Sequence, residues 1–153
     1  MKTTRLLTTL GAVTAILATA AAAEAACTIS TTAVSFGSYN VFAGSPDDAT
    51  GQIRYRCSAP RPPVVTIQLD KGGAPSFNPR LMRQASQTLN YNLYLDSTRT
   101  TIWGDGTGGT QTYRRNNPPT NQNINVTVYG RIPAGQDVSA GTYSATVTAT
   151  IFF

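Results

Sequence analysis

The ionisable residues of this 153-residue chain leave little with which to build an active site. The sequence has no histidine, and its one glutamate is Glu24. The other carboxylates are six aspartates: Asp47, Asp48, Asp70, Asp96, Asp105 and Asp137. General acid–base catalysis needs groups that exchange protons near neutral pH, and a serine nucleophile needs a neighbouring base. We therefore expect no enzymatic activity and no cofactor.

Two short stretches have the composition of ligand-binding loops. Asp47 and Asp48 could contribute to a calcium site, but a hard cation needs several converging oxygens and this spacing specifies none. The segment "WGDGTGG", residues 103–109, is rich in glycine but lacks the Gly-Lys-Ser/Thr sequence and the following helix of a phosphate loop. We predict a solvated turn at the first stretch, a tight turn at the second and no metal site.

Arginines and aromatic residues are the remaining candidates for binding. Arg54 and Arg56 flank Tyr55, so on a strand the two arginines share one face and the tyrosine points the other way. Together with Arg114 and Arg115 they could form a basic patch, but the net charge of +5 is small. We expect a solvated face and no nucleic-acid partner. A carbohydrate- or surface-binding role would instead use four aromatic side chains with loop arginines: Tyr39, Phe42, Trp103 and Tyr113.

The N-terminus predicts export. Residues 1–25 combine Lys2 and Arg5 with an apolar stretch and a small-residue ending, as in a secretory signal peptide that is removed after Ala25. No stable membrane insertion is expected, and residues 26–153 would form one domain. The chain's two cysteines, Cys27 and Cys57, then pass through an oxidising compartment, where we expect them to form a disulfide. Closing a loop of this length contributes on the order of 3.5 kcal/mol to stability.

Nearly every later segment alternates apolar and polar residues and is rich in Val, Ile, Thr and Tyr. The fold class is therefore all-β, and short regular spacing between turns favours an antiparallel immunoglobulin-like sandwich. The predicted strands span residues 28–37, 51–58, 63–70, 88–96, 100–103, 122–132 and 141–153. The segments between them, including 43–51, 71–79 and 114–122, are predicted loops.

Five sequence blocks in this order resemble the spore coat protein U domain family, which includes the pilin subunits of archaic chaperone–usher pili. The blocks are "FGSYNVFAG", "GQIRYRCS", "LNYNLYLD", "TIWGDGTGGT" and "VYGRIPAGQDVSAGTYSATVTATIFF". The sequence departs from the usual pattern at Ala145, where many relatives carry Asp, and at "YNV" after the Phe-Gly. The resemblance implies an incomplete sandwich that lacks its final strand and is completed by β-strand addition from another chain. It further implies a periplasmic pilus chaperone, an outer-membrane usher and a neighbouring subunit's donor strand as partners.

The same resemblance implies that the C-terminal segment borders the open groove. Its alternate residues share one face, which should meet the core and the chaperone or donor strand: Tyr143, Ala145, Val147, Ala149, Ile151 and Phe153. At the other end only Ala26 precedes Cys27 in the predicted mature chain, whereas a donor strand needs on the order of ten residues. We therefore expect a subunit that accepts a strand but does not donate one, at the tip of a fibre or capping an assembly.

Two functional hypotheses follow. The first is a structural subunit of a surface fibre or a protein coat, exported through the periplasm to the cell surface or beyond it, and involved in adhesion and biofilm formation. The alternative is a self-contained carbohydrate- or surface-binding sandwich. The two differ in whether the chain folds without a partner.

Overall fold

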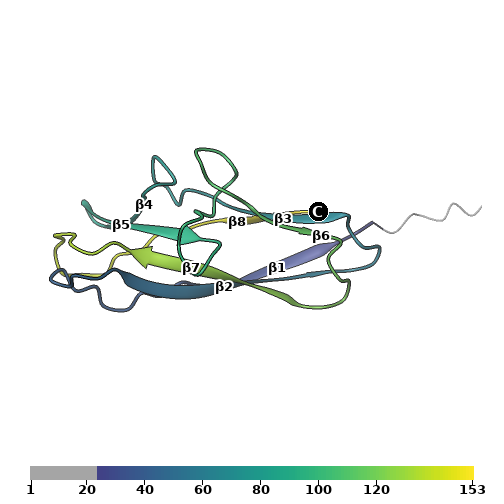
Figure 1. Ribbon diagram of the computed structural model, residues 1–153, viewed down its shortest axis with the longest axis horizontal. Coiled ribbons are helices and arrows are strands. Elements are labelled where there is room, and N and C mark those ends of the chain that lie inside the picture. The colour runs from purple at the N-terminus through teal and green to yellow at the C-terminus, as the bar shows by residue number, and fades with distance from the viewer. Residues whose placement is uncertain (1–23) are drawn as a thin grey trace, which may run out of the picture.

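The computed structural model describes residues 24–153, and all regular elements in that range are β-strands (Figure 1). They are β1 (Cys27–Thr32), β2 (Asp47–Cys57), β3 (Val64–Leu69), β4 (Arg80–Gln84), β5 (Gln87–Tyr94), β6 (Tyr113–Asn116), β7 (Ile124–Ile132) and β8 (Ala149–Phe152). The predicted signal peptide lies outside the described residues, apart from Glu24 and Ala25. No helix in the described range is long and apolar enough to cross a membrane.

Two antiparallel sheets form the sandwich. One has the strand order β1-β2-β7-β5-β4 and the other the order β6-β3-β8. Figure 1 shows β3, β6 and β8 in one layer and β1, β2 and β7 in the layer beneath. The predicted all-β, antiparallel, immunoglobulin-like class is therefore confirmed.

The core lies between the two layers and follows the predicted alternation. In β2, Tyr55 is buried while Arg54 and Arg56 are exposed, as expected for a strand with one face in water. Trp103 is completely buried, and its indole N–H donates to the carbonyl oxygen of Ile67 on β3 at 2.9 Å. The tryptophan therefore joins the loop after β5 to the smaller sheet.

The predicted disulfide is present. Cys27 and Cys57 are register partners in β1 and β2, and their sulfurs are 2.07 Å apart. Because Cys27 begins β1 and Cys57 ends β2, the bridge fixes the start of the edge strand to its only strand neighbour among the described residues.

Residues 103–109 form the predicted tight turn. The Thr107 N–H donates to the Asp105 carboxylate at 2.9 Å, and Gly106, Gly108 and Gly109 all have positive φ angles. These backbone conformations favour glycine, so the glycines of "WGDGTGG" serve the turn.

Several loop predictions were wrong. Asp47 and Asp48 belong to β2, where the Asp48 carboxylate accepts two hydrogen bonds from Arg131 on β7 at 2.7 and 2.8 Å. The start of β2 resembles a turn in sequence because two consecutive aspartates lie between Pro46 and Gly51. β6 likewise covers the first part of a predicted loop, where the consecutive arginines hide the alternation.

The sequence patterns also did not predict β4, and the predicted strand at residues 100–103 was wrong. β4 begins with the buried Arg80, and its turn to β5 consists of Ala85 and Ser86, with Ala85 at φ 48°. Glycine or asparagine usually marks such a turn, and neither is present. Residues 100–103 make only isolated bridges, Ile102 to Tyr94 and Trp103 to Gln111, so they form no strand.

Candidate functional site

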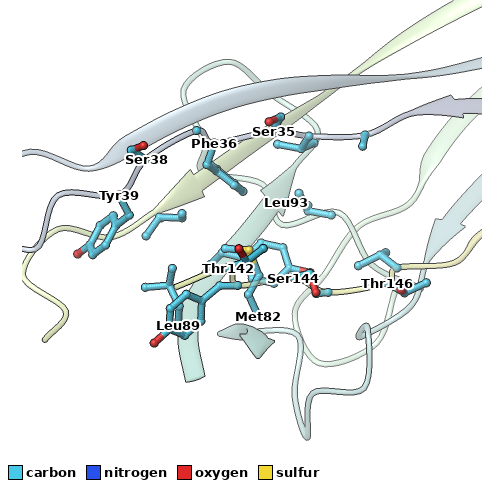
Figure 2. Close-up of a pocket in the computed structure, with 18 of the residues that line it drawn as sticks. Ser35, Phe36, Ser38, Tyr39, Met82, Leu89, Leu93, Thr142, Ser144 and Thr146 are labelled. Carbon is cyan, nitrogen blue, oxygen red and sulfur yellow. The ribbon is translucent and has the colours of Figure 1, made fainter. Parts of the chain in front are cut away.

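A long groove runs along one side of the sandwich, between its two sheets. Its volume is about 1300 Å³, and its two walls are residues 31–42 and residues 138–149. Figure 2 shows Ser35, Phe36 and Tyr39 on one side and Thr142, Ser144 and Thr146 on the other.

The floor of the groove is the hydrophobic core itself. Its side chains come from both sheets: Ile53, Leu69, Met82, Leu89, Tyr91, Leu93, Val128 and Ile132. Figure 2 shows Leu93 between the walls, with Met82 and Leu89 beside Thr142 and Ser144. A complete sandwich would cover such a floor with another strand.

The first wall continues from β1 but crosses over the inner face of the larger sheet. A Cβ atom at Gly130 would lie 2.6 Å from Cγ1 of Val34 and 2.7 Å from Cζ of Phe36, so only glycine permits this approach. The Phe36 ring also packs edge-on against Tyr91, with centroids 6.3 Å apart. The packing fixes this wall through side chains, while residues 33–39 pair with no strand in the described part of the chain.

The second wall is held along one side only. Ser144 forms a bridge with Arg83 of β4, with N···O distances of 3.2 and 2.8 Å, and β8 pairs with β3. β8 is the last strand of its sheet, so its other side is unpaired within residues 24–153. β8 therefore continues the wall as an exposed sheet edge, which offers free backbone N–H and C=O groups to an incoming strand.

The predicted C-terminal face partly matches the structure. Tyr143, Val147, Ala149 and Ile151 are half-buried against the core, while Ala145 is exposed and lines the groove. Phe153 is 51% exposed beyond the end of β8. Only Ala149–Phe152 form the strand that was predicted to span residues 141–153.

A buried arginine holds the loop that supports the second wall. The side chain of Arg80 is fully buried and donates to the Asp70 carbonyl oxygen at 3.0 and 2.9 Å. It also donates to the Trp103 carbonyl oxygen at 2.7 Å and to Oδ1 of Asn92 at 2.8 Å. Burial lowers the pKa of the guanidinium, but Arg80 remains charged because arginine titrates so far above neutrality. Sequence reasoning missed this residue, since nothing in "NPRLMR" signals that the arginine is buried.

Asp70 links this network to the wall. Its backbone N–H donates to the Thr148 carbonyl oxygen, and its carboxylate accepts the Thr148 N–H, both at 3.0 Å. The carboxylate also accepts the Gly72 N–H at 2.9 Å. Burial alone would raise the pKa of Asp70, but the hydrogen bonds from Thr148 and Gly72, with the nearby Arg80, outweigh it and lower the pKa. Asp70 therefore fixes the point where the wall becomes β8.

This geometry predicts an acid-sensitive wall. Because the pKa of Asp70 is lower in the folded than in the unfolded chain, its stabilisation is present above about pH 4 and is lost as the pH falls through the folded value. Between pH 4 and 2 the wild type should bind more protons on unfolding than Asp70→Asn, and the Thr148 amide should lose protection from hydrogen exchange. Denaturation and hydrogen exchange across that range measure both effects, on the chain held soluble by a groove-filling strand.

Asp48→Asn is the comparison for this prediction. It removes another carboxylate whose pKa is lowered, chiefly by its hydrogen bond to Arg131, but on β2 of the other sheet. It should also flatten the pH dependence, yet leave the Thr148 amide protected. Equal loss of protection at Thr148 in both variants would contradict the role of Asp70.

The aromatic residues of the alternative binding hypothesis do not form one surface. Trp103 is completely buried, and Tyr113 is half-buried with its ring centroid 6.1 Å from that of Trp103. Phe42 is 93% exposed, whereas the Tyr39 hydroxyl bonds to the Pro133 carbonyl oxygen. Trp103 therefore belongs to the core, and Tyr39 and Tyr113 pack against it. No cluster of potential metal ligands occurs among the described residues.

Comparisons with known proteins agree with this architecture. A family model described as the Spore Coat Protein U domain matches residues 13–150. Protein U of Myxococcus xanthus is 36% identical over 110 residues, which cover 68% of this chain and 59% of that protein. The chain thus spans somewhat over half the length of this relative.

A solved structure gives the same fold. It is the CsuC–CsuE chaperone–tip adhesion subunit pre-assembly complex from the archaic chaperone–usher Csu pili of Acinetobacter baumannii. One of its chains matches with a TM-score of 0.58 and 26% identity, over 85% of this chain and 40% of that chain.

Proposed function

Because the chain belongs to the Spore Coat Protein U domain family, a structural rather than enzymatic family, we propose that its groove is completed by a β-strand from another chain during assembly of a surface fibre or coat. The structural role as a pilus or coat subunit follows from the family. The strand-accepting groove is the specific mechanism that is proposed.

The unpaired edges of the groove carry this proposal. A floor of core residues lies between two walls that each have an unpaired side among residues 24–153. An extended segment placed there would gain backbone hydrogen bonds from the walls and bury alternate apolar side chains on the floor, as in β-strand addition. A small-molecule site needs no such pair of open strand edges.

The proposed pairing strand is the C-terminal segment with its six alternate residues: Tyr143, Ala145, Val147, Ala149, Ile151 and Phe153. The incoming strand would come first from a periplasmic pilus chaperone and later from the N-terminal extension of a neighbouring subunit. The chaperone complex of the structural relative supports the first step. Passage through an outer-membrane usher to the cell surface completes the proposed route.

The finer roles stay predictions. Adhesion and biofilm formation would follow from a place in a surface fibre, and the tip or capping position depends on the true mature N-terminus. Mass spectrometry of the exported protein would locate that terminus. A start well upstream of Ala25 would contradict the predicted cleavage and the position inferred from it.

The test of the proposed function is expression of the mature chain with and without a chaperone. Alone, the chain should aggregate or be degraded, because its floor and edges are uncovered. Co-expression with the chaperone of its own assembly system should raise the soluble yield several-fold and give a stoichiometric complex on size-exclusion chromatography. A stable, soluble monomer without a partner would contradict the proposal and favour the self-contained binding module.

A further inference from the structure

We infer that Tyr39 and Gln136 close one end of the groove and thereby set where an inserted strand must stop. The inference rests on the proposed strand-accepting function and adds a determinant of the partner's length and register. Figure 2 places Tyr39 at one end of the labelled wall residues, with Thr146 at the other.

Tyr39 ties the first wall to the loop that leads into the second. Its hydroxyl donates to the Pro133 carbonyl oxygen at 3.0 Å and accepts the Gln136 backbone N–H at 2.9 Å. Both hydrogen-bonding capacities of the hydroxyl are thus used between segments almost a hundred residues apart in the sequence. Tyr39 is half-buried and lines the groove at this end.

Gln136 fixes the same loop to the larger sheet. Its side-chain oxygen accepts the Asn90 N–H at 2.8 Å, and its side-chain nitrogen donates to the carbonyl oxygens of Asn90 and Pro133 at 2.9 and 3.1 Å. Asn90 lies in β5, so the loop is attached to the sheet as well as to Tyr39. The closed end is therefore a hydrogen-bonded element with no free polar group on the Gln136 side chain.

The chain also turns at this end. The Ala43 N–H donates to the Asn40 carbonyl oxygen at 3.0 Å, so the first wall folds back toward β2 just after Tyr39. At the opposite end the unpaired edges continue along β1 and β8. An inserted strand can run on past that end, but at this one it meets Tyr39, which the Pro133–Gln136 loop holds in place.

The free edge from Ser144 to Phe152 accommodates roughly nine residues, or about 30 Å of extended chain. The test uses three capped synthetic peptides that alternate valine and threonine: one of nine residues, one with two further residues at its N-terminus and one with two at its C-terminus. The denatured mature chain is refolded with each peptide, and the melting temperature of each complex is measured.

With the wild type, the complexes of the two extended peptides should differ in melting temperature by about 4 °C or more. The lower value belongs to the peptide whose extension meets the closed end. In Tyr39→Ala and in Gln136→Ala that difference should shrink to less than half, because the end is opened. Tyr129→Phe, on the outer face of β7, is the control and should keep the wild-type difference. The readout compares peptides within each variant, so a general loss of stability does not imitate the effect.

The outcomes separate the two proposals. The closed end is wrong if the nine-residue peptide binds but the complexes of both extended peptides melt at the same temperature in the wild type. It is also wrong if Tyr39→Ala and Gln136→Ala keep the full difference. In either case the groove proposal stands. If no peptide stabilises the wild type, the strand-accepting groove itself fails, and the inference fails with it.

Discussion

The Arg80→Met variant is expected to unfold with a free energy about 3–5 kcal/mol below that of the wild type. The guanidinium is fully buried and donates to three acceptors: the carbonyl oxygens of Asp70 and Trp103 and Oδ1 of Asn92. Methionine fills much of the same volume but donates no hydrogen bond. Oδ1 of Asn92 would keep the hydrogen bond from the Leu93 N–H, but the carbonyl oxygens of Asp70 and Trp103 would each lose the guanidinium, at a cost of about 1–3 kcal/mol apiece.

Arg80→Lys should also be destabilising, by about 2 kcal/mol or more. An ammonium group keeps the charge, but it lacks the planar set of donors that reaches all three acceptors. Arg83→Met on the same strand is the matched control, because Arg83 is exposed and should change stability by less than about 0.5 kcal/mol. Chemical denaturation measures all three variants, each refolded with the nine-residue groove-filling peptide, because the chain alone is expected to aggregate.

The loss should appear first at the groove. Because Asp70 is held by Arg80 and in turn holds Thr148, the Thr148 amide should lose hydrogen-exchange protection in Arg80→Met before amides in the centre of β7 do. If Arg80→Met matched Arg83→Met in stability, the buried guanidinium would not be the support of the wall that its contacts indicate.

The features that the sequence predicted correctly depend on local patterns, such as alternation of apolar and polar residues. Residues 122–132 alternate cleanly, and β7 spans Ile124–Ile132 at the centre of the larger sheet. Two cysteines in an exported chain predict a bridge, and the bridge is present. Arg80 and β4 could not be found in this way, because their stability comes from acceptors on Asp70, Asn92 and Trp103, which lie 10–23 residues away in sequence.

The two long predicted strands that the structure shortens have a different explanation. Residues 28–37 were predicted as one strand but β1 ends at Thr32, and residues 141–153 contain only β8. Both shortened segments border the groove. A strand needs a hydrogen-bonded neighbour, and the strand propensity of residues 33–37 and 141–148 has no complete partner within residues 24–153. The mismatches therefore lie where another chain is proposed to pair.

Val147→Asp is expected to weaken capture by the strand-supplying chaperone at least a hundredfold. Val147 lines the groove and is half-buried against the core, with its methyl group close to Gly72. In the empty groove an aspartate there would keep water around its carboxylate, so the folded chain should tolerate it. An inserted strand would remove that water, and burying an unpaired carboxylate costs several kcal/mol, more than the roughly 2.7 kcal/mol that a hundredfold loss requires.

Thr150→Asp adds the same charge to the same segment but on the opposite face. Thr150 lies in β8, is exposed, pairs with Gln68 of β3 and does not line the groove. Thr150→Asp should therefore bind the chaperone with an affinity within about threefold of the wild type, a change in binding free energy well under 1.4 kcal/mol. Co-purification with the chaperone and titration of the purified complex measure both variants. Equal capture of Val147→Asp and Thr150→Asp would mean that the incoming chain does not cover this wall, whereas loss in Val147→Asp alone would place its apolar face on residues 143–151.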